Sequence, residues 1–259
     1  MAHAFLKGLV AILLAGATSL AAADEPAIRV VTEELPPYNM SENGGVTGLS
    51  TEIVRTVMKG VGASANIEVL PWARAYDLAL HTENVLIYSI ARTAEREPLF
   101  KWVGAIAPTR WYLFSLSDRP IQLTTLDDAR RYHIATVNQD VGEQYLIAHG
   151  FEVGKELQSS SMYENNYRKL KVDHVELWIS NELNAINLMR KNGDDPDTTM
   201  VRSLPLPELS SENGLYMAFS PGTPDETVNR FKAELERIRR DGTYAAILDK
   251  WLKGAGPAH

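Results

Sequence analysis

Short runs of β-branched and aromatic residues alternate with segments of helical spacing along most of the chain. We predict strands over residues 28–33, 66–70, 85–90, 111–116, 133–137, 175–179 and 215–219. The apolar positions of one predicted helix recur every four residues, at Leu49, Ile53, Val57 and Val61. Two further helices are predicted over residues 143–149 and 181–191. This alternation limits the fold more than any other feature and predicts an α/β architecture with largely parallel sheets.

The C-terminal region carries clear helix signals. Thr223-Pro224-Asp225-Glu226 has the spacing of a capping box with proline at the first helical position. The apolar face of the helix that follows is formed by Val228, Phe231, Leu235 and Ile238. Asp241-Gly242 predicts a break, and a second amphipathic helix follows over residues 244–251. We expect these apolar residues to pack in the core and not to contact a ligand.

The N-terminal residues have the pattern of an export signal. His3 and Lys7 precede an apolar run over residues 9–20, and three alanines end at Ala23, before Asp24. The apolar run is shorter than the about 20 residues that a membrane span needs. We therefore expect residues 1–23 to be a cleaved signal peptide, with no direct insertion of the mature chain into a membrane. An uncleaved N-terminal anchor is the alternative.

The chain contains no cysteine. A disulfide framework, a thiolate nucleophile and a lipid attached after the signal are therefore excluded. An exported protein without lipid or membrane span is expected in the periplasm. The formal net charge of −7 becomes −8 when the signal is removed, because Lys7 is the one charged residue lost. This negative charge argues against nucleic acid or anionic lipid as a partner.

Sequence motifs of metal centres and common enzymes are absent. No two of the six histidines have the i, i+4 spacing of a zinc site. The sequence also lacks a nucleophile elbow, a phosphate-binding loop and a strand-linked dinucleotide motif. We therefore predict no metal, no cofactor and no catalytic residues.

Three clusters of polar and aromatic residues lie at the ends of predicted strands. They comprise residues 32–38 (Thr-Glu-Glu-Leu-Pro-Pro-Tyr), residues 70–75 (Leu-Pro-Trp-Ala-Arg-Ala) and residues 89–96 (Ser-Ile-Ala-Arg-Thr-Ala-Glu-Arg). In open α/β sheets, ligands bind beyond the carboxyl ends of the strands. We therefore expect the three clusters to lie at a ligand cleft.

These clusters resemble the type 2 periplasmic solute-binding proteins of family 3, best known as polar amino-acid receptors of ABC importers. The resemblance covers nearly the whole mature chain in order. Its further motifs are Gly48-Leu49-Ser50-Thr51-Glu52, Thr93-x-x-Arg96 with Phe100-x-Trp102, Asp241-Gly242-Thr243-Tyr244, and Lys250-Trp251.

The resemblance implies two lobes, each a central mixed sheet flanked by helices, with the ligand cleft between them. The first lobe comprises residues 24–110 and 208–259, and the second comprises residues 111–207. It implies that the protein captures a small polar solute, an amino acid or related carboxylate, for an inner-membrane ABC permease. We expect a monomer.

The resemblance also assigns roles to residues of the first lobe. Arg96 matches the arginine that holds the ligand's α-carboxylate, a role that suits the planar fork of a guanidinium. Ser89 and Ala91 match residues that bind the same carboxylate, Ala91 through its backbone alone. Trp72 matches an aromatic residue that lines the pocket, and Tyr38 lies beside the mouth of the cleft.

Structural roles are the alternative for two of these residues. Arg96 has glutamates beside it in the sequence, at positions 95 and 97, and can form a salt bridge with one of them. Trp72 can belong to the core.

The second lobe departs from the amino-acid pattern. Asp140 replaces a glycine, and Gly142 a hydroxyl residue, in the turn that helps to hold the carboxylate. Asn181 replaces the aspartate that binds the α-ammonium, and asparagine supplies no charge. From their positions, Asp140, Glu33 or Glu34 can supply the missing negative charge.

Two other functions remain open on this fold. One is a periplasmic dehydratase-like enzyme, with Asp140 or Glu143 as its general acid or base. The other is a sensor partner that reports the solute to a membrane receptor. The fold alone does not separate these functions from transport.

Overall fold

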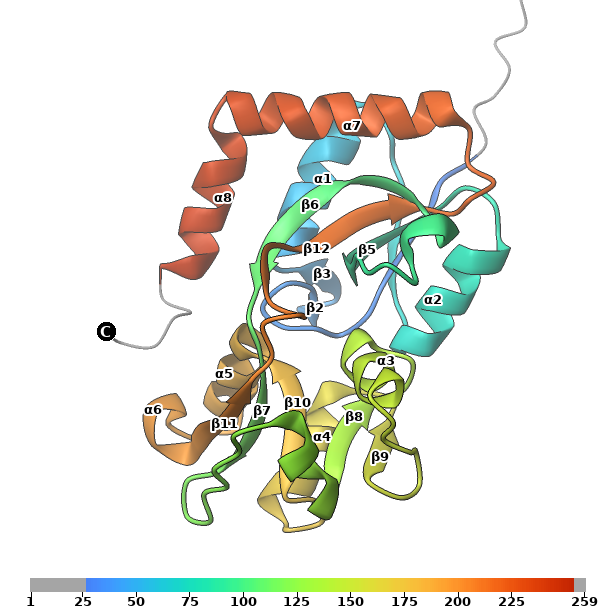
Figure 1. Cartoon of the computed structure of the whole chain (residues 1–259). Helices are drawn as coiled ribbons and strands as arrows, with labels where there is room; N and C mark the ends of the chain where they lie inside the picture. Colours follow the sequence, from blue (N-terminus) through green and yellow to red (C-terminus); the bar gives the residue numbers. More distant parts are fainter. Residues whose placement is uncertain (1–26, 254–259) are drawn as a thin grey trace, which may run out of the picture.

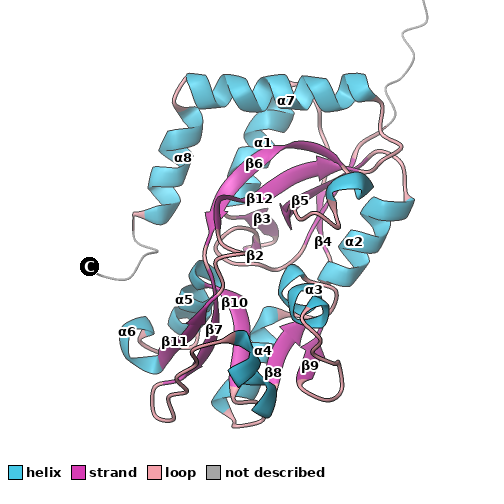
Figure 2. Ribbon diagram, viewed as in Figure 1, coloured by secondary structure: helices cyan, strands magenta, loops and turns pink. Residues whose placement is uncertain are grey.

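The computed structural model describes residues 27–253 and shows two α/β lobes, one above the other in Figure 1. Each lobe is built on a five-stranded sheet, and helices flank both sheets (Figure 2). The predicted fold class, two mixed sheets with flanking helices, is confirmed. The predicted signal peptide, residues 1–23, lies outside the described residues.

The sheet of the first lobe combines strands from both ends of the chain. Its order is β4 (Ile67–Val69), β1 (Arg29–Thr32), β5 (Val85–Ala91), β12 (Ser211–Phe219) and β6 (Lys101–Thr109). The β1 strand is parallel to β4 and β5, whereas β12 is antiparallel to both β5 and β6. A short hairpin of β2 (Met40–Glu42) and β3 (Gly45–Thr47) precedes the first helix. The helices are α1 (Leu49–Gly60), α2 (Trp72–His81), α7 (Asp225–Arg240) and α8 (Thr243–Leu252), with a short 3₁₀ helix over Glu97–Leu99.

The sheet of the second lobe is formed by the middle of the chain. Its order is β11 (Met200–Pro205), β7 (Trp111–Leu116), β10 (Leu177–Asn181), β8 (Ile134–Val137) and β9 (Leu157–Ser160). The β8, β9 and β10 strands are parallel, and β7 is antiparallel to both of its neighbours. The helices are α3 (Val141–Ala148), α4 (Tyr163–Lys171), α5 (Glu182–Lys191) and α6 (Pro196–Thr199), with a 3₁₀ helix over Leu126–Arg131.

All seven predicted strands are present, but the expectation of largely parallel sheets is wrong. Four of the eight strand pairings in the two large sheets are antiparallel. The antiparallel pairings all involve β7 or β12. These two strands follow connections that cross from one lobe to the other, so they enter their sheets without the helical crossover that makes neighbouring strands parallel.

The C-terminal helices form where predicted, but the capping box at Thr223 does not. The α7 helix begins at Asp225, with Pro224 as its N-cap residue and no side-chain cap. Pro224 has a ψ angle of 138°, which keeps it outside the helix. The Thr223 hydroxyl instead shares a hydrogen bond of 3.0 Å with the hydroxyl of Ser220. The apolar face predicted for this helix is buried as expected.

The chain passes between the lobes twice, through two connections that are hydrogen-bonded to each other. Only Arg110 separates β6 from β7, and residues 206–210 join β11 to β12. The Leu206 N–H donates to the Trp111 carbonyl at 2.9 Å, and the Trp111 N–H donates to the Ser210 hydroxyl at 2.8 Å. The predicted boundaries of the lobes lie at these connections, and the assignment of residues to lobes stays a prediction.

Within residues 27–253, no helix has the length and apolarity that crossing a membrane requires.

Candidate functional site

Arg96 lies where the two lobes meet, and its side chain joins them. Only 1% of the residue is exposed. In the first lobe, its Nη1 donates to the Ala91 carbonyl at 3.2 Å. In the second lobe, its Nε and Nη2 donate to Oε1 of Gln144 at 3.2 and 2.9 Å. Its Nη2 also donates to the Gln139 carbonyl at 3.3 Å. The predicted carboxylate anchor therefore contacts the turn and the helix that face it across the cleft.

Two aromatic rings of α2 pack against one side of the Arg96 guanidinium. The Cζ atom of Arg96 lies 5.3 Å from the ring centroid of Trp72 and 5.0 Å from that of Tyr76. Both aromatic residues are buried. Cation–π contacts strengthen when water is excluded, so these rings stabilise the buried charge. Burial lowers the pKa of Arg96 from its usual value, and the nearby Asp140 carboxylate opposes this change.

Two buried carboxylates lie close to Arg96. Glu33, directly after β1, is 3% exposed, and Asp140, at the N-terminus of α3, is 6% exposed. Burial raises the pKa of Glu33 well above its usual value, and the charge of Asp140 raises it further, whereas Arg96 opposes the rise. The site thus holds two acidic groups and one basic group away from water.

Asp140 has contacts of its own in the second lobe. The hydroxyl of Tyr163, in α4, donates a hydrogen bond to its carboxylate. Burial raises the pKa of Asp140, while this hydrogen bond, the charge of Arg96 and the N–H groups that begin α3 oppose the rise. The preceding residue, Gln139, has a left-handed φ of 58°. This turn presents the Gln139 carbonyl to the first lobe and the Asp140 side chain to the second.

Ser89 supports the loop that carries Glu33. Its hydroxyl donates to Oδ1 of Asn39, and Nδ2 of Asn39 donates to the Glu33 carbonyl at 2.6 Å. Ala91 accepts a hydrogen bond from Arg96 through its backbone carbonyl. Its predicted contact with a ligand carboxylate stays a prediction. Glu34 is half-buried and accepts hydrogen bonds from the backbone and hydroxyl of Ser41.

Two predicted site residues have other contacts. The Tyr38 hydroxyl donates to the Pro108 carbonyl of β6 at 2.9 Å, and its position beside the mouth of the cleft stays a prediction. Asn181 caps α5, with its Oδ1 accepting from the N–H of Asn184 at 2.9 Å. Asn181 Nδ2 is buried without a hydrogen-bond partner in the described residues. Nδ2 of Asn184 donates across the cleft to the Pro36 carbonyl at 3.0 Å.

Several residues of the site were not predicted. Tyr76 lies four positions after Trp72 on a helix, so the spacing of the two aromatics was a usable signal. Gln139 and Gln144 flank the replaced turn, but nothing in the sequence indicates that they reach Arg96. No sequence pattern pointed to Tyr163, because it lies 23 residues from its partner Asp140 and in a different element.

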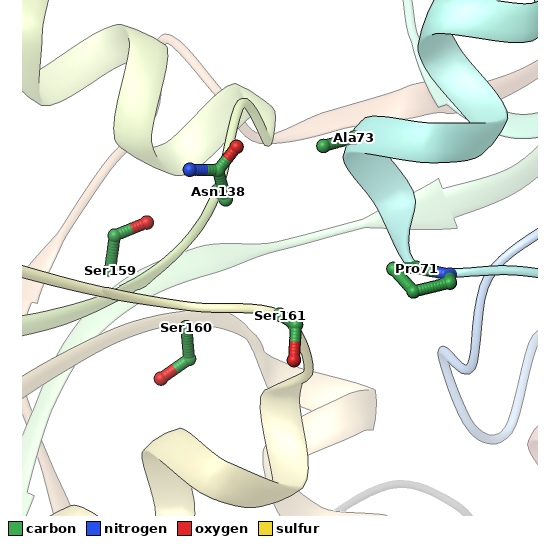
Figure 3. A pocket seen from close by; sticks show the side chains of 6 residues that line it. All are labelled: Pro71, Ala73, Asn138, Ser159, Ser160 and Ser161. Atoms are coloured by element: carbon green, nitrogen blue, oxygen red, sulfur yellow. The ribbon is translucent and has the colours of Figure 1, made fainter.

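Two hollows open between the lobes. One, of about 180 Å³, is lined by Glu33, Glu34, Ser41, Val69, Leu70, Pro71, Ser161 and Met162. The other, of about 340 Å³, is lined by Pro71, Ala73, Asn138, Ser159, Ser160 and Ser161. In the second hollow, Pro71 and Ala73 from the start of α2 lie on one side, and the serines with Asn138 lie on the other (Figure 3).

The carboxyl ends of β1, β4 and β5 therefore meet the second lobe at a polar, partly aromatic cleft. Trp72 and Asn184 supply hydrogen bonds across the cleft in addition to those of Arg96. Within the described residues, no group of acidic and histidine side chains is arranged to hold a metal ion.

A family model, the bacterial extracellular solute-binding proteins of family 3, matches residues 28–254 of this chain. No curated protein matches the sequence.

Solved structures share the fold at low sequence identity. A histidine kinase sensor domain with similarity to periplasmic binding proteins has a TM-score of 0.76 at 20% identity, over 88% of this chain and 96% of that one. An ancestral arginine-binding protein bound to arginine has a TM-score of 0.75 at 18% identity, over 87% and 97%. The substrate-binding protein of an amino acid ABC transporter has a TM-score of 0.74 at 18% identity, over 88% and 99%.

Proposed function

We propose that this chain, which belongs to the bacterial extracellular solute-binding proteins of family 3, captures a small polar solute between its lobes in the periplasm and passes it to an inner-membrane ABC permease. The observation that carries the proposal is the buried group of Arg96, Glu33 and Asp140 at the meeting point of the lobes. Such a group needs a polar partner, and closure of two lobes around a ligand is a common way to enclose one.

The contacts of the candidate catalytic residues favour binding over catalysis. The Asp140 carboxylate accepts a hydrogen bond from the Tyr163 hydroxyl. The Glu143 carboxylate accepts hydrogen bonds from the Thr136 hydroxyl at 2.5 Å and from the Gln139 N–H at 2.9 Å. Both groups that a dehydratase-like enzyme would use as acid or base therefore hold neighbouring parts of the second lobe.

A sensor role is the second candidate function. It is favoured by the similarity of the fold to a histidine kinase sensor domain, which has a TM-score of 0.76. A sensor partner uses the same closure but presents the closed form to a receptor. The two functions differ in the membrane partner, not in the cleft.

The proposal is tested by a thermal-shift screen of refolded protein that has been stripped of ligand. The panel contains amino acids and related carboxylates, which the sequence predicts as solutes, together with other organic acids and small amines. A ligand that binds the folded state raises the unfolding free energy by about 2.7 kcal/mol at a hundredfold excess over its Kd. A saturable shift with one chemical class supports the proposal, and no shift across the panel contradicts it.

Uptake separates transport from sensing. We expect a strain that lacks the gene to lose accumulation of the radiolabelled ligand found in the screen, and to regain it with the wild-type gene. Normal accumulation together with a lost cellular response to the ligand would favour the sensor role instead.

A further inference from the structure

We infer that the solute is a small organic cation without an α-carboxylate, because Arg96 is engaged by the protein itself and the buried carboxylate of Glu33, which has no partner among residues 27–253, lines the pocket beside it. The chemical class is a primary amine or guanidine with a short apolar body. This inference rests on the proposed function and names the ligand of the same cleft.

The first step concerns the donors of Arg96. A guanidinium has five N–H groups, and a carboxylate is held in bidentate form by two of them on one edge. The edge formed by Nε and Nη2 is directed to the side-chain oxygen of Gln144, at 3.2 and 2.9 Å. Nη2 also reaches the Gln139 carbonyl, and Nη1 reaches that of Ala91. These bonds leave no edge of Arg96 free for a ligand carboxylate.

One side of the Arg96 guanidinium is also covered. The rings of Trp72 and Tyr76 lie 5.3 and 5.0 Å from its Cζ atom, and only 1% of the residue is exposed. A ligand carboxylate would have to displace Gln144 or the Gln139 carbonyl from Arg96. The residue therefore acts as a clamp between the lobes.

The second step concerns Asp140. It lies at the N-terminus of α3, where free N–H groups otherwise favour an anion. The buried carboxylate of Asp140 contributes its own negative charge there, close enough to Glu33 and Arg96 to change the pKa of both. A second anion at this helix end would meet like-charge repulsion.

The third step concerns the pocket of about 180 Å³ beside this site. The Glu33 carboxylate lines it and is 3% exposed, yet no residue in the described part of the chain gives that carboxylate a hydrogen bond or ion pair. Buried carboxylates are ordinarily paired, so Glu33 lacks a partner that a ligand can supply.

The lining of the pocket defines the rest of the ligand. Its polar residues are acidic or hydroxylated, and none is a lysine or arginine. Its apolar wall is formed by Val69, Leu70, Pro71 and Met162. The volume is below the roughly 300–1,000 Å³ of pockets for drug-sized ligands. A short aliphatic cation fits this combination of charge, wall and size.

The balance of buried charge leads to the same ligand. The raised pKa of Glu33 favours its neutral form when no cation is bound, whereas in their ionised forms Glu33 and Asp140 carry two negative charges against the one positive charge of Arg96. A ligand with one cationic group neutralises the group of three, whereas an amino acid brings a further carboxylate into it.

The inference is tested by isothermal titration calorimetry with ligand pairs that differ by one carboxylate. The pairs are agmatine with arginine and cadaverine with lysine. We expect the amine of at least one pair to bind at least tenfold more tightly than its amino acid. Equal or tighter binding of the amino acids overturns the inference and leaves the proposed function standing. If none of the four compounds binds, the inference is also overturned, and the wider thermal-shift panel decides the proposed function.

Variants identify the residue that holds the cation. Glu33→Gln keeps the side-chain shape and is expected to lower amine affinity at least tenfold. The matched control, Glu42→Gln, changes an exposed carboxylate that does not line the pocket, and is expected to stay within threefold of wild type. Equal affinities of Glu33→Gln and wild type would contradict the inference.

A second pair of variants does not depend on the folding of Glu33→Gln. Met162 lines the pocket and is 40% exposed, so the fold tolerates a polar side chain there. Met162→Lys adds an ammonium to the pocket and is expected to weaken amine binding at least tenfold, whereas Met162→Gln stays within threefold of wild type. The same affinity for both variants would overturn the inference.

Discussion

The indole N–H of Trp72 donates to the backbone carbonyl of Gln139 at 2.9 Å, across the cleft from the first lobe to the second. The same carbonyl accepts a hydrogen bond from Nη2 of Arg96 at 3.3 Å. One oxygen with two lone pairs thus receives both of these donors from the first lobe. The backbone of Gln139, which carries this carbonyl, has a left-handed φ of 58°.

Trp72→Phe is expected to weaken ligand binding about fivefold, because it keeps an aromatic ring beside Arg96 but removes the donor to Gln139. A hydrogen bond contributes about 1 kcal/mol net, and 1.4 kcal/mol is a tenfold change in Kd. Calorimetry with the ligand found in the screen gives the comparison. Trp251→Phe is the control, since it removes a donor to Glu52 away from the cleft. An equal loss in both variants would show that closure does not depend on this bond.

The ligand-free protein is expected to be more stable at pH 5 than at pH 8. Burial raises the pKa of Glu33 and of Asp140 in the folded state, above unfolded values of about 4.3 and 3.9. Between the unfolded and folded pKa values the folded state binds more protons, so the unfolding free energy falls as pH rises. Urea denaturation from pH 5 to pH 8 measures this slope. Glu33→Gln should flatten it, and an unchanged slope in that variant would refute the assignment.

Arg96→Ala is expected to lower the unfolding free energy by about 3–5 kcal/mol at pH 8, because it leaves two buried carboxylates without their cation. The loss should be smaller at pH 5, where the raised pKa values of Glu33 and Asp140 favour their neutral forms. Urea denaturation at both pH values tests this. Arg74→Ala, an exposed position of α2, should change stability by no more than about 0.5 kcal/mol. A loss for Arg96→Ala that is the same at both pH values would contradict the charge argument.

Gly142→Ser is expected to destabilise the second lobe by about 1–3 kcal/mol, the usual cost of overpacking. A Cβ atom at Gly142 would lie 3.2 Å from side-chain atoms of Ile179, which is tighter than ordinary packing. Ile179→Val removes one of those atoms, so the double variant should recover part of the loss. A double-mutant cycle by urea denaturation measures the coupling. Strictly additive effects would show that the two positions do not share this space.

Strands β6 and β9 were among those not predicted, and features of the tertiary structure account for both. The β6 strand contains Gly104, against which Leu235 of α7 packs so closely that a Cβ atom would lie 2.7 Å from it. The β9 strand reads Leu-Gln-Ser-Ser and lies at the edge of its sheet. Glycine at a close approach and polar residues on an edge are properties of the tertiary structure, so local periodicity does not reveal them.

The sequence indicated the position of the cleft more reliably than the contacts that residues make within it. The motif around Arg96 and the cluster after the first strand were recognisable, and both lie where the lobes meet. The contact of Arg96 with Gln144 was not predictable, because the two residues are 48 positions apart and belong to different lobes. The proximity of Glu33 to Asp140 likewise joins residues of different lobes, which no single segment encodes.

The position of β12 between β5 and β6 has a consequence for the order in which the protein folds during synthesis. All five strands of the second sheet have been made once Pro205 has emerged, so that sheet can assemble first. Until residues 211–219 follow, the facing edges of β5 and β6 have no partner strand. While the residues between Thr109 and Ser211 are synthesised, the nascent chain therefore has strand edges that can pair with other chains. A chaperone that shields unpaired strands would protect it from aggregation during this interval.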